Sequence, residues 1–494
     1  RPVCPGAAGG ASMQLIYEKS IAGRHGVRLP LSDVPAAAEL PEGLLRKEAA
    51  GLPEISELDA VRHFTNLSRR NFSVDTNFYP LGSCTMKYNA KVLENAAALF
   101  APFHPMTALL PGGEAFCQGT LGMLHDLGSL LAEITGMDEV TTQPMAGAHG
   151  EMTGILLIAA YHAAKGNKAK KRYVVVPDSS HGTNPASAAI AGYEIITIPT
   201  AAYGDMDIEL FKQAMTDEVA AVMMTCPNTL GLFNPHIKEI ADIAHSHDAL
   251  MYYDGANLNA IMGKVKPGDV GFDVIHVNLH KTFGTPHGGG GPGSGPVGVR
   301  KSLIPFLPTP RIVKNGSGKL SIEIENSASI GRTANFFGNF GVMAKAYAYI
   351  IMLGKAGLVE VSEQAVLNAN YIKERLKAWY DLPYDTICMH ECVFSASKQA
   401  AQGVHAIDIA KFLIDKGYHP PTVYFPLIVK EAIMIEPTET ESKTTMDAFI
   451  EIMIEAAKQA ESDPGSFAAM PVTMPVTRLD ETKAAREQNV CCAW

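Results

Sequence analysis

The sequence of 494 residues has few cysteines and few charged residues, and both shortages exclude classes of protein. Its eight cysteines are too irregularly spaced for a disulfide framework, and no second pair faces Cys388 and Cys392 at zinc-site spacing. We therefore expect a reducing compartment, the cytoplasm, and no metal site. The 41 basic residues are scattered and the formal net charge is −10, so nucleic-acid binding is not expected. No apolar run looks long enough to cross a bilayer, which argues against a membrane protein.

Apolar residues are abundant: 47% of the chain is hydrophobic, which is enough to bury large cores, and the length predicts at least two domains. Residues 1–12 are rich in small residues and suggest an extension upstream of a natural start at Met13. We expect a helical N-terminal arm over residues 13–110 and a large α/β domain over 111–381. A smaller α+β domain with a tail is expected over 382–494.

Short apolar runs alternate with helical segments in the middle of the chain. Strands are predicted over residues 173–176, 194–198, 219–225, 249–253, 274–278 and 297–299. Helices are predicted over 114–135, 150–164, 236–245, 406–416 and 443–461, and over 338–379, where Gly354 and Gly357 divide the segment. Strands that are apolar throughout and separated by helices indicate a mostly parallel sheet covered by helices on both faces.

Ligands of such a sheet collect at the carboxyl ends of its strands, so the residues after each predicted strand are candidates for a site. Residues 143–150 are small and lead into a helix, where backbone N–H groups and the helix dipole attract a phosphate. A plain tight turn would look the same. His181 follows the next strand and could stack on a flat cofactor ring, although a loop histidine bonded to backbone is the commoner case.

Two charged residues follow later strands. A carboxylate at Asp254 could keep a pyridine nitrogen protonated, unless it merely caps a helix. Lys281 ends another apolar strand before a glycine-rich stretch, where burial and nearby cations favour a nucleophilic amine; a surface lysine is the alternative. The glycine run lacks a P-loop ending and precedes a strand, which excludes a nucleotide loop. The four features together predict a pyridoxal-phosphate (PLP) enzyme with its cofactor in Schiff-base linkage to Lys281.

Several longer motifs in the sequence resemble those of a known protein family. The matching stretches are Phe78-Tyr-Pro-Leu-Gly-Ser-Cys-Thr-Met-Lys-Tyr-Asn89, Ser180-His-Gly-Thr-Asn-Pro-Ala-Ser187, Asn278-Leu-His-Lys-Thr-Phe283, His287-Gly-Gly-Gly-Gly-Pro-Gly293 and Pro475-Val-Thr-Arg-Leu-Asp-Glu481. From about Met13 almost to its end, the chain resembles the glycine decarboxylase P-proteins of the glycine cleavage system. Within that family, it is similar to subunit 2 of the two-subunit bacterial form.

The resemblance implies PLP fold type I, with Lys281 as the Schiff-base lysine, Asp254 at the pyridine nitrogen and His181 over the ring. It also implies that the remaining cofactor-binding residues are Gly147, Ala148 and His280 near the phosphate, Thr225 at the ring hydroxyl, and Ala256. The implied reaction releases CO2 from glycine and transfers the aminomethyl group to the lipoyl arm of H-protein. The implied partner is P-protein subunit 1, in a heterotetramer of two copies of each chain.

The loop around Cys84 is expected near the substrate. Ser83 and Cys84 could shape the glycine or lipoyl pocket, and Lys87 could offer a positive charge to a carboxylate. A small buried cysteine filling a turn is the favoured interpretation of Cys84, because nothing visible would lower the pKa of its thiol.

Three other functions compete with this reading. Another fold type I enzyme, an aminotransferase or amino-acid decarboxylase, would carry the same strand-end motifs. A non-catalytic subunit should lack the lysine, which is present at position 281. A metal hydrolase is disfavoured, since His149 and Glu151, like His245 and His247, do not form a His-Glu-x-x-His pattern.

Overall fold

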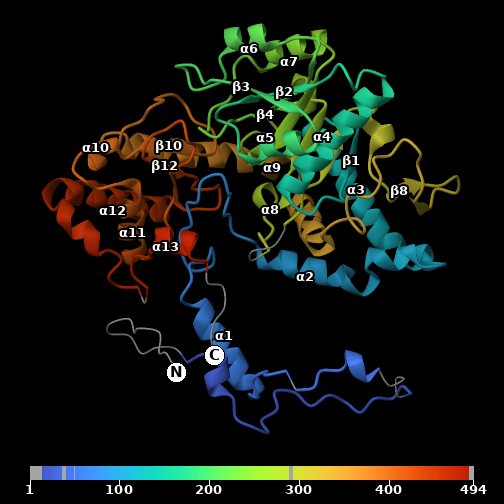
Figure 1. Ribbon diagram of the computed structural model, residues 1–494, viewed down its shortest axis with the longest axis horizontal. Coiled ribbons are helices and arrows are strands. Elements are labelled where there is room, and N and C mark those ends of the chain that lie inside the picture. The colour runs from blue at the N-terminus through green and yellow to red at the C-terminus, as the bar shows by residue number, and fades with distance from the viewer. Residues whose placement is uncertain (1–13, 36–40, 49, 289–292, 475, 489–494) are drawn as a thin grey trace. The chain divides into compact units, whose positions relative to one another are not determined.

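The computed structural model describes residues 14–35, 41–48, 50–288, 293–474 and 476–488 (Figure 1). Contacts divide the chain into two compact units, Arg1–Thr76 with Pro471–Trp494, and Asn77–Met470. The expected upstream extension, residues 1–12, lies outside the described residues, as do residues 289–292 of the glycine run and the C-terminal residues 489–494. The predicted domain limits after residues 110 and 381 stay predictions.

The first unit has little regular structure among its described residues. Its longest helix is α1 (Glu57–Ser68), and the shorter ones are η1 (Ile16–Lys19), η2 (Glu42–Leu44) and α13 (Glu481–Arg486). Helix α1 begins at a serine cap, because the Ser56 hydroxyl accepts the Asp59 N–H at 3.1 Å.

The second unit is built around a seven-stranded sheet. Its strands are β1 (Glu139–Thr141), β2 (Tyr173–Pro177), β3 (Glu194–Ile198), β4 (Val219–Thr225), β5 (Leu250–Gly255), β6 (Val274–Val277) and β7 (Val297–Val299). Their order is β1-β7-β6-β5-β4-β2-β3, and β7 is antiparallel to both neighbours whereas the other pairs are parallel. The predicted mostly parallel sheet is confirmed. Strand β1 was not predicted, because three residues carry too little pattern.

Helices cover both faces of this sheet, as predicted. They are α3 (Gln118–Thr135), α4 (Gly147–Ala164), α5 (Thr183–Ile190), α6 (Ile208–Ala214) and α7 (Ile237–Ser246). Two further helices of this unit are α2 (Lys91–Phe100), before α3, and the short α8 (Leu279–Thr282), after β6. Side chains of one strand alternate between two cores: Met251 and Tyr253 pack with Leu121 of α3, whereas Tyr252 packs with Ile155 of α4. Strand β5 is therefore buried on both sides, which explains its uninterrupted apolar run.

The long helix α9 (Phe340–Leu376) corrects one expectation from the sequence. It is long and apolar enough, by length and composition, to cross a membrane. Its side chains nevertheless lie in two cores, with Met343 beside the large sheet and Ile372 among the C-terminal elements. We therefore assign α9 as a core helix. Gly354 interrupts it with φ 59° and ψ −172°, so the predicted division at this glycine is confirmed.

The C-terminal elements form a second, smaller sheet with helices, which confirms the predicted α+β character. The strands are β10 (Cys392–Ser395), β11 (Thr422–Val423) and β12 (Ala432–Ile435), in the order β10-β12-β11. The helices are α10 (Ser397–Ala400), α11 (Ala406–Asp415) and α12 (Lys443–Ser462). Phe78, more than 300 residues earlier in the chain, packs edge-on against Phe449 of α12 at 5.0 Å, which joins the motif-bearing loop after it to this sheet.

Smaller elements complete the unit. A two-stranded sheet joins β8 (Arg311–Lys314) to β9 (Leu320–Glu323). Short 3₁₀ helices lie at Ala101–Phe103, Pro105–Leu109, Gly113–Phe116, Leu258–Ala260, Pro267–Val270, Lys301–Phe306 and Pro464–Ala469.

Candidate active site

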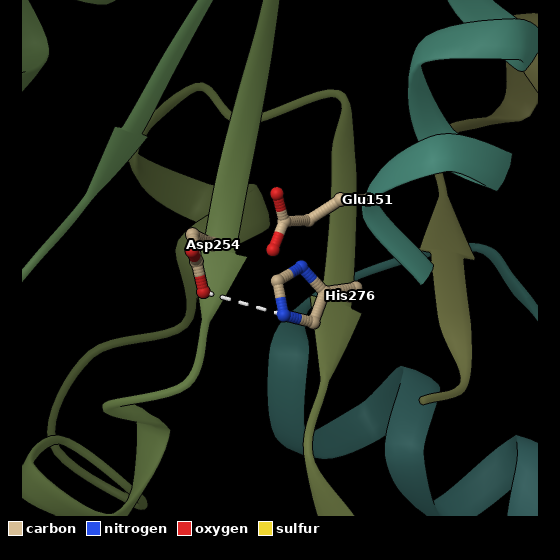
Figure 2. A group of neighbouring side chains, drawn as sticks. All are labelled: Glu151, Asp254 and His276. Carbon is tan, nitrogen blue, oxygen red and sulfur yellow. Dashed lines mark ion pairs between the residues drawn. The ribbon is translucent and has the colours of Figure 1, made fainter. Parts of the chain in front are cut away.

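Asp254 lies at the carboxyl end of β5, where its carboxylate faces His276 of β6. Parallel pairing places Asp254 opposite His276, and the two side chains approach to 3.3 Å between Oδ1 and Nε2. Figure 2 shows Glu151 of α4 converging on the same point. All three side chains are buried, and they form a cluster of ionisable groups at the edge of the sheet where the sequence predicts a ligand.

The carboxylate of Asp254 is held by neutral donors as well. Asn184 Nδ2 donates to Oδ2 at 3.0 Å, and the Ala256 N–H donates to Oδ1 at 3.0 Å. Burial raises the pKa of Asp254, but His276 and these two hydrogen bonds outweigh burial, so the pKa lies below its usual value. Asp254 is therefore ionised at neutral pH, as a partner for a protonated ring nitrogen must be.

His276 is a neutral neighbour of this carboxylate. Burial lowers the pKa of its imidazole, and the Tyr252 hydroxyl lies 2.7 Å from Nδ1. If that hydroxyl donates to Nδ1, the one ring proton resides on Nε2, the nitrogen nearest to Asp254. The neutral imidazole of His276 therefore holds the Asp254 carboxylate in place without placing a full positive charge beside it.

Glu151 was not predicted as a site residue. Thr183 Oγ1 donates to its Oε1 at 2.8 Å, and Asn184 Nδ2 donates to its Oε2 at 2.9 Å, so one amide serves both Glu151 and Asp254. Burial, with the Asp254 carboxylate second, raises the pKa of Glu151 to about 7. The available signal was a lone acidic residue in the otherwise apolar helix α4.

His181 is joined to this cluster through Thr183. Its Nδ1 is 2.8 Å from Thr183 Oγ1, the hydroxyl that also contacts Glu151, and its exposed ring lies 5.9 Å from that of Phe425. The charges of Asp254 and Lys281 both act on it. The structure therefore brings His181 to the predicted place, while its stacking role stays a prediction.

Lys281 belongs to α8, the short helix that follows β6. Its half-buried amine makes no hydrogen bond and no ion pair with any described residue. Its positive charge favours the ionised forms of four buried carboxyl groups, those of Asp254, Glu151, Glu391 and Glu436. A lysine amine with no hydrogen-bond or ion-pair partner among the described residues is available for covalent chemistry.

The residues predicted around a phosphate lie at the start of α4 and near α8. Helix α4 begins at Gly147, followed by Ala148, and no side chain caps its first N–H groups. A Cβ on Gly147 would lie 2.8 Å from Asn278 Oδ1, so a larger residue would displace the Asn278 side chain. His280 accepts the Ser294 N–H at 3.2 Å, and burial lowers the pKa of His280 to about 3, so its imidazole is neutral. Backbone N–H groups would therefore supply most of the attraction for an anion.

Several buried side-chain oxygens near Lys281 and Asp254 have no hydrogen-bond partner among the described residues. Thr225 Oγ1 is one of them, and β4–β5 pairing places Thr225 opposite Asp254. The others flank Lys281 in the chain or follow the glycine run: Asn278 Oδ1, Thr282 Oγ1, Thr285 Oγ1 and Ser294 Oγ. Unpaired buried oxygens are costly, so their concentration here fits a polar cofactor that would supply the missing hydrogen bonds.

The loop predicted to shape the substrate pocket packs against two glutamates. The Ser83 N–H donates to Glu391 at 2.8 Å, and the backbone at Ser83 is held at φ 63°. Cys84 beside it is partly buried, and burial raises the pKa of its thiol, with the Lys281 charge opposing. A neutral thiol fits the structural interpretation that the sequence favoured for Cys84.

Lys87 is buried and paired. Its Nζ donates to Glu439 Oε1 at 2.6 Å and to the Thr282 carbonyl at 2.9 Å. Burial lowers the pKa of Lys87, but Glu439 and Tyr349 outweigh burial and raise the pKa above its usual value. The charge expected to meet a substrate carboxylate is thus balanced by Glu439, and a direct substrate contact stays a prediction.

Replacing Lys87 by methionine should therefore be strongly destabilising. The change leaves the Glu439 carboxylate buried without its cation, which typically costs about 3–5 kcal/mol of unfolding free energy. Urea unfolding measures the loss, and the double variant K87M/E439Q should recover most of it. Lys443→Met, which removes an exposed ion pair with Asp447, is the control and should leave the unfolding midpoint unchanged. Equal midpoints for wild type and K87M would contradict the pairing.

Among the described residues, two groups of ionisable side chains are compact enough to contain metal ligands. They are Glu151 with Asp254 and His276, and His390 with Glu391 and Glu436. The Lys281 charge acts on every member of both groups and would repel a cation. In the first group, the Asn184 amide already occupies oxygens of both carboxyl groups. We assign neither group as a metal site.

Known proteins resemble this chain over almost its whole length. A probable glycine dehydrogenase (decarboxylating) subunit 2 of Bacillus velezensis is 55% identical over 478 residues, covering 96% of each chain. One from Listeria welshimeri is 54% identical over 481 residues, covering 96% of this chain and 97% of its own. The family described as glycine dehydrogenase, C-terminal domain, matches residues 361–467.

Solved structures share the fold at low identity. An inhibitor-bound glycine decarboxylase (P-protein) of the glycine cleavage system superposes with a TM-score of 0.68 at 20% identity, covering 84% of this chain and 93% of its own. A cysteine desulfurase from Thermococcus onnurineus gives 0.59 at 15% identity, covering 78% and 95%. The expected PLP fold type I is thereby confirmed. With relatives above half identity along 96% of its length, the chain belongs to the family of glycine dehydrogenase (decarboxylating) subunit 2.

Proposed function

We propose that this chain is the PLP-binding catalytic subunit of a glycine decarboxylase, which releases CO2 from glycine and passes the aminomethyl group to the lipoyl arm of H-protein. The observation that carries the proposal is the unpaired Lys281 amine, placed so that its charge acts on the ionised Asp254 at a strand-end site. We propose glycine as the substrate because the relatives are named glycine dehydrogenase.

The residues present fit the cofactor. Lys281 would hold its aldehyde carbon, and the uncapped N–H groups at Gly147 and Ala148 would bind its phosphate. Thr225 would meet the ring hydroxyl through its unpartnered oxygen. When bound, the protonated pyridine ring accepts the electron pair that remains when glycine loses CO2.

The protein's own groups have separate tasks in that reaction. Asp254 would keep a proton on the ring nitrogen, because its lowered pKa leaves it charged at neutral pH. Asn184 and His276 would fix the aspartate's two oxygens. Cys84, a neutral thiol, would not attack the lipoyl disulfide as a nucleophile.

The name subunit 2 implies a partner subunit. We propose that the partner is P-protein subunit 1, in a complex of two copies of each chain, and that lipoylated H-protein docks on this complex. We place the complex in the cytoplasm, since the described cysteines, Cys84, Cys117, Cys226, Cys388 and Cys392, are free thiols.

The exchange of labelled bicarbonate into the carboxyl group of glycine tests the function. We expect exchange when the chain is combined with subunit 1 and lipoylated H-protein, and a loss of exchange when the H-protein lacks its lipoyl group. Glycine consumption with transfer of its amino group to a keto acid, independent of H-protein, would establish an aminotransferase instead. Preference for a larger amino acid would establish another decarboxylase.

A further inference from the structure

A chain of three side chains joins the buried Glu151 to the exposed ring of His181. Glu151 Oε1 lies 2.8 Å from Thr183 Oγ1, and the same hydroxyl oxygen lies 2.8 Å from His181 Nδ1. Glu151 is buried in α4, Thr183 is the first residue of α5, and His181 precedes that helix. The other ring nitrogen of His181, Nε2, has no hydrogen-bond partner among the described residues. A change of state at the buried end of this chain therefore reaches a nitrogen that is open to a ligand.

The hydroxyl in the middle of the chain donates only one hydrogen bond, so both hydrogen bonds must run in the same direction. If Glu151 is ionised it can only accept, so Thr183 donates to Glu151 and His181 Nδ1 donates to Thr183. If Glu151 is protonated it donates to Thr183, and Thr183 donates to Nδ1. Partial desolvation lowers the pKa of the His181 ring, which is therefore neutral at pH 7 and carries one proton. The first form leaves a lone pair on Nε2, and the second leaves a proton there.

Two neighbouring hydrogen bonds fix the remaining atoms. Asn184 Nδ2 donates to Glu151 Oε2 at 2.9 Å and to Asp254 Oδ2 at 3.0 Å, so a proton on Glu151 is left to Oε1, the oxygen that faces Thr183. The Thr183 N–H donates to His181 Nδ1 at 3.3 Å, which requires an unprotonated nitrogen. This second contact favours the form in which Glu151 is protonated.

The ionisable groups around Glu151 bring its two forms close in free energy. The Asp254 carboxylate, with an oxygen within 4.8 Å, repels a second negative charge, and Figure 2 shows the two side chains together. Lys281 favours the ionised form, and burial keeps His276 and Tyr252 neutral. Burial, with Asp254 second, raises the pKa of Glu151 to about 7. Both forms are therefore populated near neutral pH.

We propose that Glu151 is a positioning residue that controls the tautomer of His181 through Thr183. A protonated Glu151 keeps the ring proton of His181 on Nε2, and an ionised Glu151 moves the ring proton to Nδ1. On ionisation the Oε1–H bond of Glu151 breaks and its proton joins Thr183 Oγ1, while the hydroxyl proton of Thr183 moves to His181 Nδ1. The Nε2–H bond then breaks and that proton leaves to solvent, so the ring stays neutral and Nε2 keeps the electron pair.

The switch determines what His181 offers to a bound group. With Glu151 protonated, Nε2 is a hydrogen-bond donor, and with Glu151 ionised it is an acceptor. The relevance of the switch to catalysis rests on the proposed function, in which His181 lies over the cofactor ring. The tautomer itself is measured without cofactor, glycine or H-protein.

NMR of the full-length chain, with isotope-labelled ring nitrogens in histidine, distinguishes the two tautomers. We expect the Nε2–H form of His181 at pH 6 and the Nδ1–H form at pH 9, with their ratio changing about tenfold per pH unit, as one proton requires. His181→Asn removes the signal and so identifies it. His162 is the internal reference: its Nε2 lies 2.9 Å from the Ala220 carbonyl, which only accepts, so its tautomer should stay Nε2–H throughout.

Three variants locate the switch in this chain of side chains. In Glu151→Gln the amide oxygen can accept from Asn184 and the amide NH2 can donate to Thr183, which copies the protonated form. We therefore expect Nε2–H from pH 6 to 9 in this variant. Thr183→Val, of similar shape but without the hydroxyl, should remove the response to pH, and Thr183→Ser should switch as wild type.

Glu455→Gln, at an exposed ion pair with Lys416, is the matched control and should also switch as wild type. A single His181 tautomer at every pH in wild type, or a switch that persists in Glu151→Gln or Thr183→Val, would overturn the proposal. The wild-type titration alone decides the first point, even if a variant does not fold. Failure of the wild type to attach PLP would instead contradict the proposed function and leave the measured switch standing.

Discussion

Lys281→Ala is expected to abolish covalent cofactor attachment and to lower glycine–bicarbonate exchange by about 10⁴-fold or more, as losses of a covalent group do. The physical reason is that Lys87, whose amine donates to the Thr282 carbonyl in the residue next to Lys281, is also bound to Glu439 and is not free to replace Lys281. Borohydride reduction followed by peptide mapping should label the peptide containing position 281 in wild type and no peptide in the variant.

The fold should tolerate this change, because the Lys281 amine has no partner among the described residues to leave unpaired. Lys281→Arg preserves the positive charge and should be equally inactive, which separates covalent chemistry from electrostatics. Lys264→Ala, at an exposed pair with Glu363, is the control. A borohydride label that persists in Lys281→Ala would refute the assignment.

Asp254→Asn is expected to lower the exchange rate by about 10³-fold, within the range for lost electrostatic stabilisation at an active site. An amide cannot keep a proton on the pyridine nitrogen, so the ring would withdraw electrons less strongly. Asn184 Nδ2 and the Ala256 N–H now donate to different oxygens of the carboxylate. In the variant, one of these two donors would face the amide NH2 group, which cannot accept its hydrogen bond. The absorbance of the bound cofactor and the exchange rate, measured from pH 5 to 9, check both effects.

The sign of the pH dependence follows from the lowered pKa of Asp254. Because that pKa lies below the usual value for an aspartate, the charged form persists through neutral and mildly acidic pH, and its contribution is lost only as pH falls through the lowered value. The wild type should therefore show no loss from this group above pH 5, and the variant should be low throughout. Asp217→Asn, at an exposed position, should match wild type. Full activity in Asp254→Asn would show that the aspartate has no role in the mechanism.

The sequence predicts the large sheet and its strand-end residues well, and for a physical reason. Each parallel strand is an uninterrupted apolar run, and parallel strands bring their carboxyl ends to one edge. Asp254 and Lys281 could be found because each directly follows such a run. Helix α5 was missed because the polar residues at its start resemble a loop, although Pro185 is tolerated within a first helical turn.

The residues that sequence reasoning missed lie where the local pattern says little about the site. Glu151 resembles a surface residue of a helix until its burial is known. His276 lies inside an apolar strand, where a histidine is most simply a core residue. Glu391 and Glu436 are 45 positions apart and meet only through the β10–β12 register, which no local pattern reveals.

The register between β5 and β6 determines which side chain Asp254 meets, so a misfolded molecule with shifted strands could be recognised at this residue. Because Asp254 and His276 are cross-strand neighbours, sliding β6 by a single position would present Ile275 or Val277 to the aspartate. Successive side chains point to opposite faces, so the imidazole would turn away at the same time. A molecule with misaligned strands would thus lose the surroundings of its aspartate, and a titration signal from the Asp254–His276 contact would report the fraction of chains whose strands are correctly aligned.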